Sequence, residues 1–179
     1  MSFERILFVP GIKTWKIYFK GWEKDLEKFF PNIEKIFFYD FYLHFEHKKI
    51  EKIVEKGKKL LSDGKKTLII SHSFGGILAK TMINRCRKKA KIYKFITMAS
   101  PHDMKIFGVN SAKKFLKTPL TVSVPTKTFG GFLDLVVPFF WSHCKNSQKK
   151  KNFWCGHLSF LFYRKIRKKV LLDELNISK

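Results

Sequence analysis

The sequence has few cysteines and few acidic residues, and both shortages limit what the protein can be. Its three cysteines, Cys86, Cys144 and Cys155, are odd in number and form no CxxC pair. Neither a disulfide framework nor a zinc knuckle is therefore indicated. We expect these thiols to be buried or to have no chemical role. We also expect neither a metal nor a cofactor. Only 14 Asp and Glu residues accompany 37 Lys and Arg residues, which leaves a formal net charge of +23 at pH 7.

The sequence also lacks a long apolar run. Its most apolar neighbourhood, GGFLDLVVPFFW, is interrupted by Asp134 and Pro138. It is much shorter than the roughly 18 apolar residues of a membrane span. The first residues, MSFERILFV, carry charge at Glu4 and Arg5 and lack the apolar region of a secretory signal. We therefore expect a cytoplasmic protein.

The positive charge predicts an affinity for anions. A net charge of +23 attracts nucleic acid or an anionic membrane surface. Short basic clusters occur at RCRKKAKIYK, KNSQKKK and RKIRKK. The other cations are spread over the predicted helices, and no aromatic RNA-binding strand is found. A solvated lysine-rich surface without a partner is the alternative, and the sequence indicates no obligate protein partner.

Short apolar segments alternate with amphipathic segments, which is typical of a parallel sheet covered by helices on both faces. The most regular helix-like segment, HKKIEKIVEKGKKLLSDG, has apolar residues at helical spacing and ends at Gly64. We expect an α/β fold of about six parallel strands in a single domain over residues 1–179. Strand-like runs lie at 5–9, 35–39, 67–71, 93–100 and 120–124, with a further candidate at 152–155.

The segment KTLIISHSFGGILAK, residues 66–80, passes from a strand-like run to a helix-like run at a serine. A nucleophile at the top of a parallel sheet lies on such a turn, which needs small residues two positions before and after it. Ser73 has Ser71 and Gly75 at these positions, so the motif is SxSxG, one substitution from GxSxG. The Cβ of Ser71 predicts some strain. A serine that only caps the helix is the alternative.

Four further loops with polar residues or glycine follow predicted strands, at the sheet edge where α/β folds bind ligands. They are VPGIKTW, SPHD, FGGFLDLVVP and CGHLS. Together with the serine turn, they contain Ser73, Asp134 and His157 in that chain order. On these motifs the chain resembles the α/β-hydrolase superfamily, and in particular its compact lipases and esterases without a lid.

The resemblance implies that Ser73 is the nucleophile, Asp134 the acid and His157 the base of a catalytic triad. It also implies that the backbone N–H groups of Ile12 and Phe74 form the oxyanion hole. The activity expected from it is hydrolysis of carboxylic esters with short to medium acyl chains, through an acyl-enzyme. No cofactor is implied. About twenty residues separate the fourth and fifth predicted strands, too few for a cap domain.

Alternatives remain open for the site and for the activity. Asp103 competes with Asp134 for the acid, because some superfamily members supply the acid from the preceding strand. His72 and His102 compete with His157 for the base. The ring of His72 should point away from the nucleophile. His102 is expected to line the ligand-binding crevice at this edge of the sheet. The same scaffold would also suit an acyltransferase, a thioesterase, a lactonase or a basic binding module without catalysis.

Overall fold

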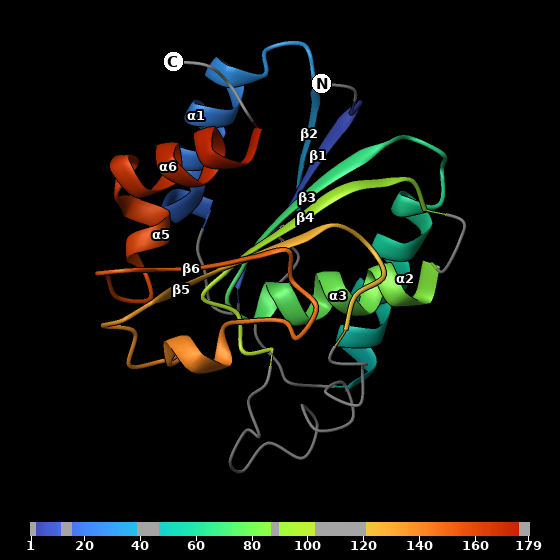
Figure 1. Cartoon of the computed structure of the whole chain (residues 1–179). Helices are drawn as coiled ribbons and strands as arrows, with labels where there is room; N and C mark the ends of the chain where they lie inside the picture. Colours follow the sequence, from blue (N-terminus) through green and yellow to red (C-terminus); the bar gives the residue numbers. More distant parts are fainter. Residues whose placement is uncertain (1–2, 12–15, 39–46, 87–89, 103–120, 176–179) are drawn as a thin grey trace.

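A computed structural model describes residues 3–11, 16–38, 47–86, 90–102 and 121–175. These ranges contain six strands that form one sheet in the order β2-β1-β3-β4-β5-β6. All neighbouring strands are parallel, as the sequence predicted (Figure 1). The strands are β1 (Arg5–Val9), β2 (Glu34–Phe37), β3 (Thr67–His72), β4 (Ile92–Met98), β5 (Thr126–Gly131) and β6 (Lys149–Phe153).

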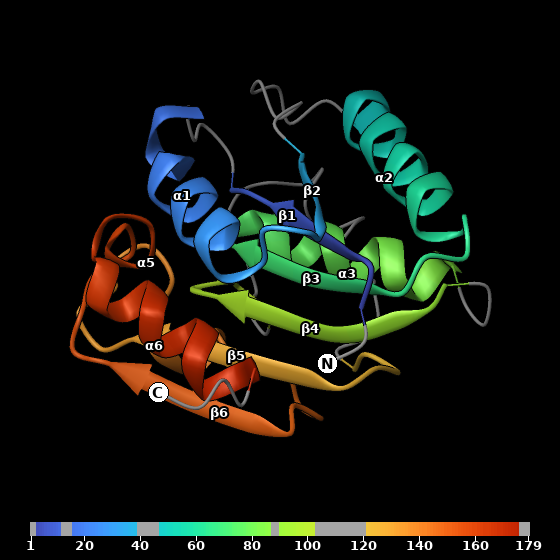
Figure 2. The same ribbon diagram turned by 90° about the horizontal axis from the view of Figure 1, so that it is seen from above.

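Helices cover both faces of the sheet, with α1, α5 and α6 on one face and α2 and α3 on the other (Figures 1 and 2). The predicted amphipathic helix is α2, and Gly64 follows it with a φ of 90°. No helix in the described ranges has the length and apolar character needed to cross a membrane. The helical elements are η1 (Lys16–Phe19), α1 (Lys20–Phe29), α2 (His47–Leu61), α3 (Phe74–Cys86), η3 (Phe139–Trp141), α5 (Ser159–Phe162) and α6 (Arg164–Leu175).

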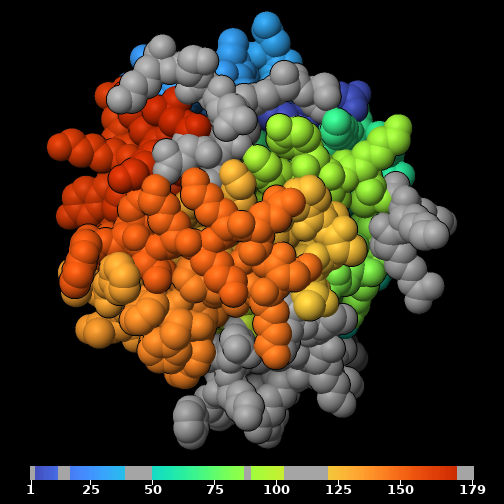
Figure 3. Space-filling view, viewed as in Figure 1, coloured from blue at the N-terminus to red at the C-terminus, as the bar shows by residue number. Residues whose placement is uncertain are grey.

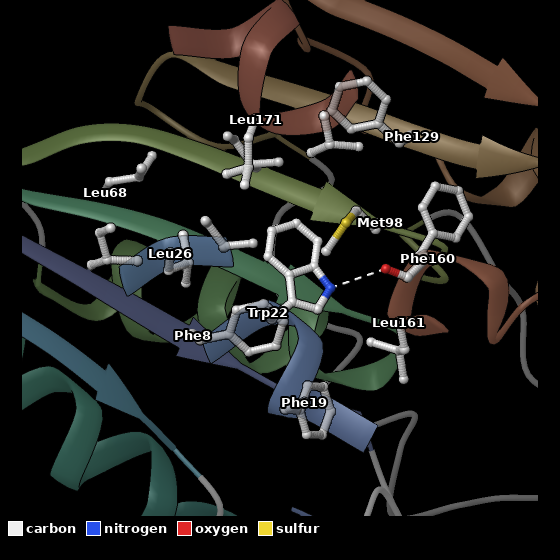
Figure 4. Close-up of a cluster of buried hydrophobic side chains, with 14 of the residues drawn as sticks. Phe8, Phe19, Trp22, Leu26, Leu68, Met98, Phe129, Phe160, Leu161 and Leu171 are labelled. Carbon is white, nitrogen blue, oxygen red and sulfur yellow. Dashed lines mark hydrogen bonds between the residues drawn. The ribbon is translucent and has the colours of Figure 1, made fainter. Parts of the chain in front are cut away.

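Successive strand residues pack into two separate cores. In β1, Phe8 lies in the core beneath α1, α5 and α6, whereas Leu7 lies in the core beneath α2 and α3. β1 and β3 are buried along their whole length, which explains their continuous apolar runs. In the first core, the indole N–H of Trp22 donates to the carbonyl oxygen of Phe160 at 3.0 Å (Figure 4). This bond ties α1 to α5.

The fifth strand prediction is wrong, although the first four match β1, β2, β3 and β4. Residues 121–124 form no strand, and β5 begins at Thr126. The apolar side chain of Val122 packs into the second core from a loop instead, where its N–H donates to Asn146 Oδ1 at 3.2 Å. The sequence did not indicate β5, because the strand contains two glycines and glycine is depleted in strands. A Cβ atom on Gly131 would lie 2.4 Å from the carbonyl oxygen of Cys155.

The sixth strand overlaps the predicted segment 152–155 but begins earlier, at Lys149. Three consecutive lysines, Lys149 to Lys151, open this strand at the edge of the sheet. Charged side chains on an edge strand oppose pairing with another chain. The strand has few apolar residues, so the sequence did not indicate its first part. The same low apolar content suits a strand at the edge of the sheet.

The three cysteines are buried and form no disulfide, as the sequence predicted. Burial raises the pKa of Cys144 and Cys155 to about 11. It also raises the pKa of Cys86. These thiols therefore stay protonated near neutral pH. No cluster of three potential metal ligands occurs in the part of the chain that the structure describes.

A buried ion pair joins α1 to α6. Arg167 Nε donates to Asp25 Oδ2 at 2.7 Å, and both side chains are almost completely buried. The same guanidinium donates to the carbonyl oxygens of Leu161 and Phe162, each at 2.8 Å. Since a buried charge needs such partners, Arg167 fixes the position of α5 relative to α1.

We expect Asp25→Asn to lower the free energy of unfolding by about 3 kcal/mol, because Arg167 would keep a buried charge without a counter-ion. Glu27→Gln on the same helix is the matched control. It removes an exposed carboxylate that pairs with Lys35 at 2.7 Å, and it should cost less than about 1 kcal/mol. Urea unfolding followed by circular dichroism measures both changes. Equal, small losses would contradict the role given to the buried pair.

Candidate active site

The three residues predicted to catalyse the reaction lie on three loops at one edge of the sheet. Ser73 follows β3, Asp134 lies shortly after β5, and His157 lies shortly after β6. Parallel strands bring their carboxyl ends to the same edge. Figure 2 shows β4 and β6 pointing toward the end of the sheet at which α5 lies.

The structure brings these three side chains into contact. Ser73 Oγ lies 2.9 Å from His157 Nε2, and His157 Nδ1 lies 2.8 Å from Asp134 Oδ2. An ionised carboxylate only accepts hydrogen bonds, so Nδ1 of the neutral ring carries the proton and Nε2 is left to accept. The serine hydroxyl can therefore donate to Nε2. Ser73 and His157 are each partly exposed.

The carboxylate of Asp134 is held in place by its own loop. Its Oδ1 accepts the N–H groups of Val136 and Val137 at 2.9 and 2.7 Å, and its other oxygen faces His157. The side chain is fully buried. Asp134 thus fixes a turn of its own loop and contacts the histidine as well. Its competitor Asp103 lies outside the described residues.

Ser73 lies on a sharp turn between β3 and α3. Its φ of 54° is in the left-handed region, which non-glycine residues seldom adopt. The turn depends on two glycines that let backbone segments approach closely. A Cβ on Gly75 would lie 2.2 Å from the carbonyl oxygens of Val9 and Pro10, and a Cβ on Gly11 would lie 2.8 Å from Ser73 Cβ.

Ser71 differs from the glycine usual at its position, and we expected strain there. It lies in β3 with its side chain buried, and its Oγ is 3.4 Å from the carbonyl oxygen of Ile96. Ser73 has a positive φ, whereas Ser71 does not. A serine therefore fits in the strand itself, and the turn carries the strain.

The structure describes only one of the two predicted oxyanion donors, Phe74. Phe74 is the first residue of α3, directly after Ser73. The beginning of a helix favours negative charge, because its N–H groups point outward along the axis. Ile12 lies outside the described residues, so its role stays a prediction.

His72 contacts the loop that carries His157, which the sequence did not indicate. We expected its ring to point away from the nucleophile. The ring is completely buried, its Nε2 lies 3.0 Å from the carbonyl oxygen of His157, and the two ring centroids are 4.8 Å apart. Because a carbonyl only accepts, Nε2 carries the proton. Burial, with a smaller contribution from the nearby His157, lowers the pKa of His72 to about 3.

His102 does not line the crevice, so that prediction is wrong. Its side chain is buried on the face of the sheet that α2 and α3 cover, edge-on to Phe95. Its Nε2 lies 3.0 Å from Thr97 Oγ1. Burial, followed by the nearby charge of Lys80, holds the pKa of His102 well below its usual value. It is therefore a neutral core residue.

Comparison with known protein families gives one match. A family model described as the PGAP1-like alpha/beta domain matches residues 34–152, which is more than half of the chain. The chain belongs to this family. The matched segment includes Ser73 and Asp134 and ends shortly before His157. A comparison with curated protein sequences gave no match.

Solved structures of α/β hydrolases share the fold. A lipase-esterase related protein from Clostridium acetobutylicum is 14% identical, with a TM-score of 0.67 over 94% of this chain and 93% of its own. A monoacylglycerol lipase from Paleococcus ferrophilus is 9% identical, with a TM-score of 0.63 over 94% and 91%. The RedJ thioesterase from Streptomyces coelicolor is 13% identical, with a TM-score of 0.60 over 96% and 88%. The chain thus shares the fold of these α/β hydrolases.

We expect His72→Phe to lower the turnover of an ester substrate by about tenfold to a hundredfold, because the loop that carries His157 loses its anchor. KM should change little. His72→Gln, which keeps an N–H donor, should recover much of the loss. The loss should be constant between about pH 6 and pH 8, since a pKa of about 3 keeps the ring neutral there.

His102→Gln is the matched control, because it changes another buried histidine that bonds to Thr97 and not to His157. It should lower stability with little effect on turnover. Thermal melts and steady-state kinetics of all three variants separate the two effects. Equal losses of turnover at both positions would contradict a positioning role for His72.

Proposed function

We propose that the protein is a serine hydrolase of carboxylic esters. The observation that carries the proposal is the pair of contacts from Ser73 Oγ to His157 Nε2 and from His157 Nδ1 to Asp134 Oδ2. A serine hydroxyl is a weak nucleophile unless a neighbouring base takes its proton. Contacts of 2.9 and 2.8 Å supply both the base and the group that orients it.

In the first half of the reaction, Ser73 Oγ attacks the ester carbonyl carbon while its proton passes to His157 Nε2. Asp134 stabilises the imidazolium that results. The negative charge that develops on the carbonyl oxygen is held by the backbone N–H groups of Phe74 and Ile12. The C–O bond to the alcohol then breaks, and the alcohol leaves with the proton from His157. An acyl-enzyme on Ser73 remains.

In the second half, water replaces the alcohol. His157 takes a proton from the water, whose oxygen attacks the acyl carbon. The bond to Ser73 Oγ then breaks, the serine recovers its proton, and a carboxylic acid leaves. We propose short to medium acyl chains, up to about eight carbons, as the substrates that this machinery handles best, on the expectation that the segment between the fourth and fifth strands is too short for a cap domain.

A thioesterase is the second candidate, supported by the shared fold with the RedJ thioesterase. The same serine, histidine and oxyanion donors serve either leaving group, because the attacked carbonyl is alike. A lactonase differs only in that alcohol and acid belong to one molecule. An acyltransferase would need an alcohol to reach the acyl-enzyme before water does.

We expect the protein to hydrolyse p-nitrophenyl acetate, butyrate and octanoate, and Ser73→Ala to lower turnover by about a millionfold, to the background. A fluorophosphonate should label the wild type once, and mass spectrometry should place the label on Ser73. Thioester substrates with the same acyl groups test the second candidate. Labelling that persists in Ser73→Ala, or folded wild type that is inert to probe and esters, would refute the proposal.

We also expect Asp134→Asn to lower turnover by up to about ten-thousandfold while the fold is kept, because the amide favours the wrong tautomer of His157. Asp103→Asn is the matched control and should cost about tenfold or less. Circular dichroism checks the fold of both variants. The reverse order of the two losses would assign the acid to Asp103.

A further inference from the structure

The exposed large apolar side chains of the described residues share one location. Every one of them lies on η1, the β5–β6 connection, the loop after β6, α5 or the residue after α5. These segments meet at the carboxyl end of the sheet, where Ser73 lies. The set, here called the apolar rim, consists of Ile17, Phe132, Leu133, Leu135, Val136, Phe140, Trp154, Leu158, Phe162 and Tyr163.

Side-chain and backbone contacts join these segments. The rings of Phe132 and Trp154 lie 5.0 Å apart, and those of Tyr18 and Phe162 lie 5.4 Å apart. The N–H of Phe132 donates to the carbonyl oxygen of Phe153 at 2.9 Å, so the loops after β5 and β6 are bonded together. In the space-filling view the orange surface of the β5–β6 region adjoins the red surface of α5 and α6 (Figure 3).

Residues of the apolar rim are chain neighbours of Asp134 and His157. Leu135 follows Asp134 directly, and Leu158 follows His157 directly. Leu135 is 96% exposed and Trp154 is 80% exposed, so neither contributes much to the core. Single exposed apolar residues need no explanation, but a group gathered at one end of a molecule marks a contact surface.

Cations flank the apolar rim, and the acidic residues near them are Glu23 in the first turn of α1 and buried Asp25, whose Oδ1 lies 3.8 Å from Arg164 Nε. Lys20 at the start of α1, and Arg164 and Lys165 at the start of α6, are exposed next to rim residues. Asp134 is the only acidic residue on the segments 16–19, 132–141 and 154–163, and it is buried against His157. A surface that combines apolar insertion with flanking cations matches an anionic lipid membrane.

The kinds of apolar residue also favour lipid over nucleic acid. Trp154 and Tyr163 are amphipathic aromatics, which settle at the boundary between lipid and water. Leu135 and Val136 at the loop tip are aliphatic, so they cannot stack on bases as single-stranded nucleic acid requires. Nucleic acid would also need cations within the surface to contact phosphates, whereas here they lie beside it.

We propose that the apolar rim docks the protein on an anionic phospholipid membrane, with Ser73 and His157 facing the boundary between lipid and water. Loop tips such as Leu135 would enter the headgroup region, and Lys20, Arg164 and Lys165 would contact lipid phosphates. The docking stands on the surface alone. Its consequence, that esters of membrane amphiphiles reach Ser73 from the bilayer, rests on the proposed function.

Docking is tested by co-sedimentation with vesicles, using Ser73→Ala protein so that hydrolysis does not alter the lipid. We expect binding to vesicles of phosphatidylglycerol and phosphatidylcholine, and much weaker binding to phosphatidylcholine alone. The double variant Leu135→Gln/Trp154→Gln should bind at least about tenfold more weakly, because two apolar side chains no longer enter the lipid. Absence of binding to the anionic vesicles at low salt would overturn the proposal.

A pair of charge-reversal variants separates local contact from net charge. Lys20→Glu/Lys165→Glu removes cations beside the apolar rim, and Lys52→Glu/Lys59→Glu makes the same change on exposed positions of α2, across the sheet. We expect the first pair to weaken vesicle binding about tenfold and the second to have little effect. If both charge-reversal pairs weakened vesicle binding equally, and the Leu135→Gln/Trp154→Gln variant did not weaken it, the binding would depend on net charge alone. This result would overturn the proposal.

Two further measurements exclude other occupants of the surface. Sedimentation velocity without lipid would reveal a dimer that the Leu135→Gln/Trp154→Gln variant abolishes, and homopolymer RNA tests nucleic acid. Either of these, in place of vesicle binding, would contradict docking on lipid. The p-nitrophenyl ester assay uses no vesicles, so it tests the proposed function separately from the docking. An inert protein that still binds vesicles would refute the proposed function alone, and an active protein that ignores them would refute the docking alone.

Discussion

The parallel pairing of the six strands is the constraint on which the site depends, because it brings every loop that carries a catalytic candidate to one edge. Ser73, Asp134 and His157 are far apart in the chain, yet each follows a strand closely. Close packing behind the serine completes the arrangement. Gly75 leaves no room for a side chain next to the carbonyl oxygens of Val9 and Pro10, so β1 lies directly against the serine turn.

Backbone groups hold the members of the candidate triad. Asp134 is fixed by two N–H groups of its own loop, and the carbonyl of His157 accepts a hydrogen bond from buried His72. Behind them, the buried Arg167 pairs with Asp25 and holds α5. Since these supports lie inside the molecule, the outward side chains of the same loops are not needed for the geometry. They are apolar instead, which is why we connect them with lipid.

Many of the lysines lie on elements that carry no residue of the apolar rim. Lysines open the edge strand β6 and cover α2, where they oppose strand pairing and keep the protein solvated. The exposed large apolar side chains of the described residues lie instead on the segments of the apolar rim. The solved relatives are too distant in sequence to transfer more than a fold. Function therefore has to be argued from the site itself.

Local patterns in the sequence determined the α/β class, the first four strands, the serine turn and the order of Ser73, Asp134 and His157, because each is written within a few neighbouring residues. Only the tertiary structure decided what depends on distant neighbours. β5 is a strand because β4 and β6 pair with it, despite its glycines. His72 meets His157, and His102 is buried, because packing directs their rings. Hydrophobic periodicity reports that a side chain is apolar, but solvent exposure depends on the elements that cover it, so only the fold separated the apolar rim from the core.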